Sequence, residues 1–197
     1  MMQYKIMLTG PSGSGKDTMA QAIKDVIPNC HAVAFADELK RAASWIVQGI
    51  LERESMTANE FDPDSEAGRK IMRPLWQWLG TDFVRNVVDK EHWINAVDAT
   101  IRSKNHLWID HVPPSFIVTD CRFNNEHQWG IANGFVIVRI DRKLRTPAGI
   151  PGHVSELEHE DIKEDLCYKN KGTIENMREW VVSSLLPYCA GMERFHV

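Results

Sequence analysis

Three residues near the start of the chain, Gly10, Gly15 and Lys16, are spaced as Gly-x4-Gly-Lys. Glycines allow a tight turn whose backbone N–H groups point at a phosphate, and the N-terminal end of a following helix favours the negative charge. The lysine reaches the outer phosphates of a nucleoside triphosphate. The spacing therefore predicts a loop that binds a nucleoside triphosphate, with these residues in contact: Gly13, Ser14, Gly15, Lys16, Asp17 and Thr18.

The elements around this loop have to be a strand and a helix for the motif to function. Residues 4–9 are a short apolar run, and Met19, Ala22, Ile23 and Val26 follow at helical spacing. A strand, a glycine loop and a helix form the context that the motif requires. The competing interpretation is a glycine-rich turn between two core elements.

One position departs from the usual motif. Asp17 stands where a Ser or Thr normally reaches Mg²⁺, and the hydroxyl of Thr18 comes one residue later. Adenylate-kinase-like enzymes show a similar late hydroxyl in Gly-Lys-Gly-Thr. Either side chain is a candidate Mg²⁺ ligand, and the choice between them stays open.

Composition limits the classes of protein to consider. With 197 residues, 43% of them hydrophobic, the chain suits one compact domain. A net charge of −4 without a basic run argues against a nucleic-acid polymer as partner. No apolar run approaches the ~18 residues of a membrane span, so we expect a cytoplasmic protein. The cysteines lack metal-binding spacing and are expected to be free thiols: Cys30, Cys121, Cys167 and Cys189.

A second strand over 31–35 leads into a helix that opens with Asp37 and Lys40. Asp37 near a helix start is favoured by the helix dipole, and Lys40 is an ordinary solvated charge on sequence grounds alone. By itself, this stretch predicts a helix and no binding site.

Four polar residues recur every four positions along the next helical segment: Arg73, Gln77, Thr81 and Arg85. On a continuous helix they drift slowly around one face. Two arginines, an amide and a hydroxyl are suited to hold a phosphate and a base, because the guanidinium fork matches phosphate oxygens in pairs. The alternative is that both arginines pair with acidic groups at the surface.

A buried strand over 115–120 ends in an acid, Asp120, and Arg122 follows. Ligands of open α/β sheets bind outside the carboxyl ends of the strands, so both residues are expected on the side of the phosphate loop. A carboxylate there holds Mg²⁺, usually through water. The run 107–110 ends in Asp110 and has the same pattern; we favour Asp120.

A further strand over 135–140 leads into a basic, turn-rich stretch from 141. Arginines in such loops act as lids that stabilise a transferring phosphoryl group, and the candidates are Arg139, Arg142 and Arg145. Nearer the C-terminus, Asn170 and Gly172 form a turn before a helix.

Five patches in the same order resemble bacteriophage deoxynucleoside monophosphate kinases. They are Gly-Lys-Asp-Thr at 15–18, Phe-Ala-Asp-x-Leu-Lys at 35–40, the stretch 73–85, Asp-x-Arg-Phe-x-Asn-Glu at 120–126, and His-x-Ser-Glu at 153–156. With the resemblance, we expect catalytic roles for Lys16, Arg85 and Arg122, and we add Arg142 as a lid candidate, although the choice among the lid arginines stays open. Asn170 and Gly172 join the expected ATP site. The resemblance implies these substrate-binding residues, to which we add Trp93 as a further candidate: Asp37, Lys40, Arg73, Gln77, Gly80, Thr81, Asp82 and Arg85.

Motifs and resemblance together predict an α/β phosphate-loop kinase, with a parallel sheet and helices on both faces. One domain is expected over 1–197, with a helical substrate-binding insert over 36–105 and a lid-like segment over 141–160. The expected reaction is transfer of the γ-phosphoryl group of ATP to a deoxynucleoside 5′-monophosphate, with Mg²⁺ held by Asp17, Thr18 or Asp120. The protein is expected in the cytoplasm, which would be the host cytoplasm if the protein is viral. A homodimer is one option for its oligomeric state.

Two alternatives remain open at this point. Related phosphate loops serve kinases of other small phosphorylated metabolites, of the phosphomevalonate or dephospho-coenzyme A type. A binding protein that takes ATP without catalysis would carry the same loop. Activity with a panel of acceptors separates the three interpretations.

Overall fold

The computed structural model describes residues 2–53, 62–63, 65–142 and 161–192. The chain forms two compact units. The first combines Met1–Ala34 with Asp98–Val197, and the second is Phe35–Val97. This second unit begins within one residue of the insert expected over 36–105, but it ends earlier, at Val97.

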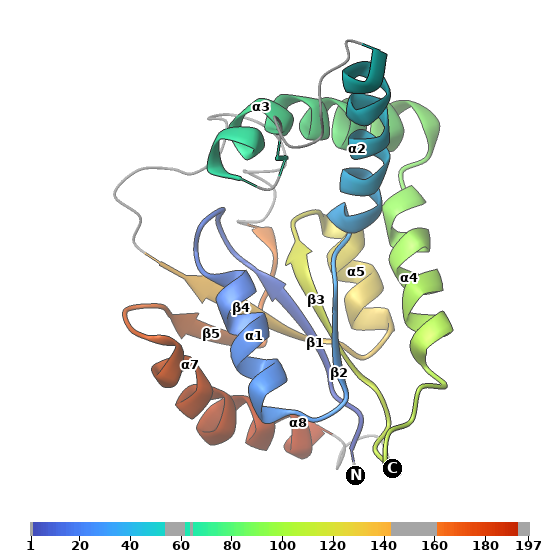
Figure 1. Ribbon diagram of the computed structural model, residues 1–197. Helices are drawn as coiled ribbons and strands as arrows, with labels where there is room; N and C mark the ends of the chain where they lie inside the picture. Colours follow the sequence, from blue (N-terminus) through green and yellow to red (C-terminus); the bar gives the residue numbers. More distant parts are fainter. Residues whose placement is uncertain (1, 54–61, 64, 143–160, 193–197) are drawn as a thin grey trace. The chain divides into compact units, whose positions relative to one another are not determined.

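The first unit is built on a five-stranded sheet in the order β2-β3-β1-β4-β5, in which every neighbouring pair is parallel (Figure 1). The strands are β1 (Lys5–Thr9), β2 (Cys30–Val33), β3 (Ser115–Cys121), β4 (Val136–Asp141) and β5 (Leu166–Lys169). Parallel strands need long crossover connections, and these place helices on the faces of the sheet.

Helices cover both faces, which explains why β1 and β4 each contain an uninterrupted apolar run, 6–8 and 136–138. Ile6 and Leu8 of β1 belong to the core cluster formed with α1 (Lys16–Val26) and α7 (Ile174–Trp180). Met7, between them, points to the other face, where its side chain approaches Gly130 of α5 (Asn124–Ala132). A strand buried on both sides has no polar face, so its sequence shows a continuous run instead of an alternation.

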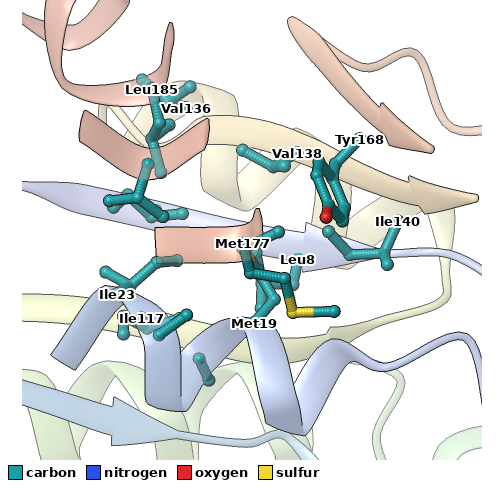
Figure 2. Close-up of a cluster of buried hydrophobic side chains, with 14 of the residues drawn as sticks. Leu8, Met19, Ile23, Ile117, Val136, Val138, Ile140, Tyr168, Met177 and Leu185 are labelled. Carbon is teal, nitrogen blue, oxygen red and sulfur yellow. The ribbon is translucent and has the colours of Figure 1, made fainter. Parts of the chain in front are cut away.

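The core of the first unit lies between the sheet and its helices. Figure 2 shows Leu8, Met19, Ile23, Val138 and Met177 meeting in this cluster. Among the described residues, the helical segments that lie wholly within this unit are α1 (Lys16–Val26), α5 (Asn124–Ala132), α7 (Ile174–Trp180), η3 (Val181–Leu185) and α8 (Leu186–Met192). The segment η3 is a π-helical continuation of α7.

The position of β1 in the sheet determines where ligands bind. Its neighbours are β3 on one side and β4 on the other. The crossover that leaves β1 leads to β2, beyond β3, whereas the crossover that leaves β3 leads in the opposite direction to β4. Such a switch point is the ligand-binding crevice of open α/β sheets. There the Thr9 hydroxyl donates to the Cys121 carbonyl at 3.0 Å, which ties the end of β1 to the end of β3.

The second unit is helical. It contains α2 (Ala36–Arg53), α3 (Glu66–Gln77), the π-helix η1 (Trp78–Val88) and the first part of α4 (His92–Lys104). Ser65 caps α3 by accepting a hydrogen bond from the Gly68 N–H at 2.9 Å. The indole N–H of buried Trp93 donates to the Gly80 carbonyl at 2.9 Å, which joins α4 to η1.

The sequence-based strand assignments agree with the sheet. The strand expected over 31–35 spans Cys30–Val33, and the strand ending near Asp120 is β3. The competing run at 107–110 lies outside the sheet. Its Ile109 forms an isolated antiparallel bridge with Val112 across a tight turn, in which Asp110 (φ 47°) and His111 (φ 64°) are left-handed.

The predicted α/β fold, a parallel sheet with helices on both faces, is therefore confirmed. The prediction of free thiols is confirmed for all four cysteines. Burial raises the pKa of the Cys30 thiol to about 12 and that of Cys189 to about 11, so both are protonated at neutral pH. No helix in the described ranges combines the length and the apolar character needed to cross a membrane.

Candidate active site

The phosphate loop connects the carboxyl end of β1 to α1. Gly10 (φ 129°), Gly13 (φ 77°) and Gly15 (φ 102°) all have backbone angles that L side chains rarely adopt. Gly10 is also confined by space, because a Cβ there would lie 2.4 Å from the carbonyl oxygen of Ile140. The glycine spacing in the sequence thus reflects a backbone that only glycine can form.

Lys16 is the first residue of α1, and the residue is only 9% exposed. Its Nζ donates to the carbonyl oxygens of Gly10 at 2.8 Å and Pro11 at 2.9 Å. The ammonium group therefore lies against the loop whose amides are expected to bind phosphate. Asp17 and Thr18 follow in the first turn of α1, and both are exposed.

The loop is also held by a residue from the far end of the chain. Asn170, just after β5, donates from Nδ2 to the Ser14 carbonyl at 2.7 Å. Ser14 is fully buried, and its Oγ has no hydrogen-bond partner among the described residues. Gly172 is exposed in the turn that leads to α7, where Thr173 caps the helix. Nothing in the spacing of the sequence indicated the contact between Asn170 and Ser14.

Asp120 and Arg122 lie at the end of β3, the strand beside β1, and both are half-buried. The chain turns sharply after them because Glu126, 3% exposed, accepts hydrogen bonds from the backbone N–H of Arg122 and Phe123 at 2.8 and 3.0 Å. Glu126 therefore has a structural role at the start of α5.

The arginines expected in the lid differ in their surroundings. Arg139 of β4 forms an ion pair with Glu164 at 3.0 Å and donates to the Ile162 carbonyl, so it holds the segment before β5. Burial opposes ionisation of Glu164, but Arg139 and a backbone hydrogen bond outweigh it and hold the Glu164 pKa below its ordinary value. Arg142 is exposed just after β4. Arg145 and the rest of the lid-like segment, 143–160, lie outside the described residues.

In the second unit, the four residues with the four-residue repeat lie on one continuous helical segment. Arg73 and Gln77 belong to α3, whereas Thr81 and Arg85 belong to η1. Four residues exceed one α-helical turn but fall short of one wider π-helical turn. A step of four residues therefore rotates slightly past a full turn in α3 and slightly short of one in η1. Because these two rotations are opposite in sense, the change to a π-helix keeps the four positions near one face. Arg73, Gln77 and Arg85 are half-buried, and Thr81 is buried.

Two polar atoms on consecutive residues of α3 are buried without a partner among the described residues. They are the Trp76 Nε1 donor and the Gln77 Oε1 acceptor. A buried polar group without a hydrogen bond costs about 1–3 kcal/mol, so each such group calls for an explanation. Lys40 of α2 lies over the Trp76 ring, 5.8 Å from its centroid, and Asp37 is exposed in the first turn of α2.

The remaining candidates of this unit are partly structural. Gly80 approaches α2 closely, since a Cβ there would lie 2.5 Å from Leu39 Cδ2, and its carbonyl accepts from Trp93. Asp82 is exposed in η1. The structure thus shows packing roles for Gly80 and Trp93, and their expected contact with substrate stays a prediction.

Within the described ranges, no group of three His, Cys, Asp or Glu side chains is placed to hold a metal ion. Mg²⁺ requires no such group, because it keeps several waters and takes one or two carboxylates together with substrate phosphates. The oxygen donors of Asp17, Thr18 and Asp120 fit this chemistry, and all three lie at the carboxyl ends of β1 and β3 or in the following helix turn.

Comparison with known proteins assigns the family. A family model described as deoxynucleotide monophosphate kinase matches residues 52–181, which is more than half of the chain. This chain belongs to that family. The resemblance found in the sequence motifs to deoxynucleoside monophosphate kinases is therefore confirmed. The family makes the chain a phosphotransferase with ATP as its co-substrate. The match begins after the phosphate loop, so the loop is supported by its own geometry.

One solved structure, the first below, supports the fold of this deoxynucleotide monophosphate kinase family member, and two further kinases are similar at lower scores. A sugar kinase from a Janibacter species is 12% identical with a TM-score of 0.51, and the match covers 93% of this chain and 95% of that one. A gluconokinase from Sinorhizobium meliloti is 11% identical with a TM-score of 0.48, covering 96% and 95%. A shikimate kinase from Aquifex aeolicus is 15% identical with a TM-score of 0.46, covering 94% and 98%. No curated protein matches significantly.

Proposed function

We propose that this chain transfers the γ-phosphoryl group of ATP to a deoxynucleoside 5′-monophosphate, giving ADP and the deoxynucleoside diphosphate. The observation that carries the proposal is the family match over 52–181, which contains the segment with Arg73, Gln77, Thr81 and Arg85. The phosphate loop with Lys16 supplies the second half of the argument, a site for the donor.

The donor side of the reaction is assigned to the first unit. The loop amides and Lys16 would hold the β- and γ-phosphates, because an ammonium group and backbone N–H groups neutralise charge on the transferring phosphoryl group. Arg122, at the end of β3, and Arg142, after β4, are assigned to the charge on the equatorial oxygens. Arg139 is not proposed for this role, since Glu164 and the Ile162 carbonyl already engage it.

A bound Mg²⁺ would supply positive charge that neutralises part of the charge on the ATP phosphates. The Thr18 hydroxyl and the Asp17 and Asp120 carboxylates are the groups of this chain that would hold it, in part through water. Because Thr9 ties the end of β1 to the end of β3, the sheet positions Asp120 beside the strand that begins the loop.

The acceptor side is assigned to the second unit. Arg73 and Arg85 would bind the acceptor phosphate, since the guanidinium fork matches two of its oxygens. The unpartnered Oε1 of Gln77 and N–H of Trp76 would pair with a base, which presents donors and acceptors side by side on one edge. Asp37, Lys40 and Asp82 are the remaining polar candidates of this unit.

No covalent intermediate is needed for this reaction. The acceptor phosphate is itself a nucleophile, so catalysis consists of positioning the two substrates and stabilising charge. The residues named above are suited to both tasks, and none of them has to act as a nucleophile.

The test is ADP release in the presence of ATP and Mg²⁺, with each ribo- and deoxynucleoside monophosphate supplied in turn. The proposal expects release that depends on a deoxynucleoside monophosphate. Release that depends only on another phosphorylated metabolite would contradict it and favour a kinase of that metabolite. ATP binding without acceptor-dependent release would identify a non-catalytic nucleotide-binding protein.

A further inference from the structure

Asn170 connects the last strand of the sheet to the phosphate loop. Its backbone N–H donates to the Asp141 carbonyl at 2.6 Å, which fixes it at the carboxyl edge of β4 and β5. Its side-chain Nδ2 donates to the Ser14 carbonyl at 2.7 Å, across 156 residues of sequence. The hydrogen bond to Asp141 therefore fixes the backbone of Asn170, and the hydrogen bond to Ser14 fixes the end of its side chain.

The contact with Ser14 determines the direction of a different group, the N–H of Gly15. The described chain contains no cis peptide bond, so the Ser14 C=O and the Gly15 N–H point in opposite directions within one planar peptide unit. Since the carbonyl is directed at Asn170, the amide is directed away from it. Amides at this point of the loop, just before the helix, are those that bind phosphate.

The Ser14–Gly15 peptide needs such a contact because glycine restrains it so little. Gly15 has φ 102°, and glycine populates both signs of φ with little preference. Rotation of this peptide unit would present a carbonyl oxygen to the phosphate where the amide should be, which replaces attraction by repulsion. The packing at Gly15 is also close, since a Cβ there would lie 2.6 Å from Asn170 Nδ2 and 3.5 Å from Met177 Cε.

We propose that Asn170 is a positioning residue of the phosphate loop, which keeps the Gly15 N–H directed at the phosphates of ATP by holding the Ser14 carbonyl. It acts through the loop and requires no contact with the adenine or the ribose. The inference rests on the loop being the ATP site of the proposed function, and it is independent of which acceptor the enzyme uses.

Binding of inorganic tripolyphosphate, measured by calorimetry beside binding of ATP, tests the proposal without any acceptor. The Asn170→Ala variant loses one hydrogen bond to the loop, so both ligands are expected to bind about 3- to 10-fold more weakly, by the same factor. Asn170→Asp has nearly the same shape but places a carboxylate oxygen against the Ser14 carbonyl. We expect it to lose more than about ten-fold, since two acceptors repel where a donor stood.

Asn176 provides the matched control, because it lies in the first turn of α7 and its Oδ1 accepts from the Thr173 N–H at 3.0 Å. Asn176→Ala and Asn176→Asp introduce the same changes in size and charge near the same turn, and both are expected to bind tripolyphosphate within about three-fold of the parent, since exposed charges are screened by salt. Thermal unfolding shows whether each variant is folded. If Asn170→Ala does not fold, the isosteric Asn170→Asp decides.

Three results would overturn the proposal. Weaker ATP binding with unchanged tripolyphosphate binding would show that Asn170 contacts the nucleoside. Unchanged binding of both ligands would show that the contact with Ser14 is irrelevant to the loop. Equal losses in the Asn170→Asp and Asn176→Asp variants would show a general effect of charge. If the unmodified protein shows no deoxynucleoside monophosphate kinase activity, the proposed function is contradicted, whereas this inference about the loop still stands.

Discussion

Lys16 donates from Nζ to the carbonyl oxygen of Gly10 at 2.8 Å, so the ammonium group of the loop's last residue lies against the loop's first residue. The two residues are the ends of the Gly-x4-Gly-Lys spacing. The contact places the positive charge beside the phosphate loop, the turn that is shaped by the glycines. A ligand phosphate in the loop would therefore meet the amides and the ammonium group together.

Replacing Lys16 by alanine is expected to leave the fold intact and reduce turnover by on the order of 10²-fold or more. The reason is that the ammonium group stabilises charge on the transferring phosphoryl group, and loss of one such donor has this magnitude. Steady-state kinetics and circular dichroism measure the two effects. Lys24→Ala, in an exposed position of the same helix, is the control and is expected to retain activity. A folded Lys16→Ala enzyme within a few-fold of the parent would contradict the phosphate-loop assignment.

Replacing Arg85 by lysine retains the charge but removes the planar fork, so we expect a substantial loss if Arg85 binds the acceptor phosphate. A lost charge-assisted hydrogen bond is worth about 1.5–3 kcal/mol, which corresponds to about a ten- to hundred-fold rise in KM for the acceptor or fall in kcat. The KM for ATP should change much less.

Arg69→Lys is the matched control, since Arg69 is exposed on α3 of the same unit. It is expected to change neither KM. If Arg85→Lys weakens ATP and spares the acceptor, the assignment of the acceptor site to this helix is wrong. If it behaves like Arg69→Lys, Arg85 has no role in binding.

Replacing Trp93 by phenylalanine removes the indole N–H and leaves the buried Gly80 carbonyl without its donor. The free energy of unfolding is expected to fall by about 1–3 kcal/mol, the cost of an unsatisfied buried polar group. Urea denaturation measures it, with Trp45→Phe, 75% exposed on α2, as the control. A changed acceptor KM without loss of stability would instead support direct contact between Trp93 and the substrate.

Stability is expected to decrease as the pH falls through the range of His31 ionisation. Burial lowers the pKa of His31 below its ordinary 6.5, with smaller contributions from Lys104 and Lys24. The unfolded chain then binds a proton at a higher pH than the folded chain, so the free energy of unfolding declines from about pH 6.5 downward until the folded pKa is passed. Thermal unfolding between pH 7.5 and 5 measures it.

His31→Gln should remove the part of this pH dependence that His31 contributes, whereas His106→Gln, at an exposed position, should retain it. An identical decline in the parent and in the His31→Gln variant would assign the pH dependence to other groups.

The phosphate loop could be predicted from sequence because its information is local. Gly10, Gly13 and Gly15 are needed at fixed positions by backbone angles that other residues rarely adopt, so their spacing is visible in the chain itself. The strands β1, β3 and β4 were similarly visible, because burial on both faces leaves an uninterrupted apolar run.

Other features depended on contacts between distant segments and were decided only by the tertiary structure. The sequence does not say that β1 lies between β3 and β4, which is what makes its carboxyl end a binding crevice. It does not distinguish Arg139, engaged by Glu164, from Arg142 in the same basic stretch. The widening of the helix at Trp78, which keeps Arg73 and Arg85 near one face, has no simple sequence signal either.

The physical reason for this division is the range of the interactions. Backbone angles and burial periodicity are properties of a few neighbouring residues, so residue type reports them directly. The hydrogen bond from Asn170 to Ser14 depends on how two segments 156 residues apart pack, and a single asparagine in a turn is equally compatible with many other partners. The sequence by itself determined the loop and the strand that carries it, and the packing of the sheet decided which distant residue holds that loop in shape.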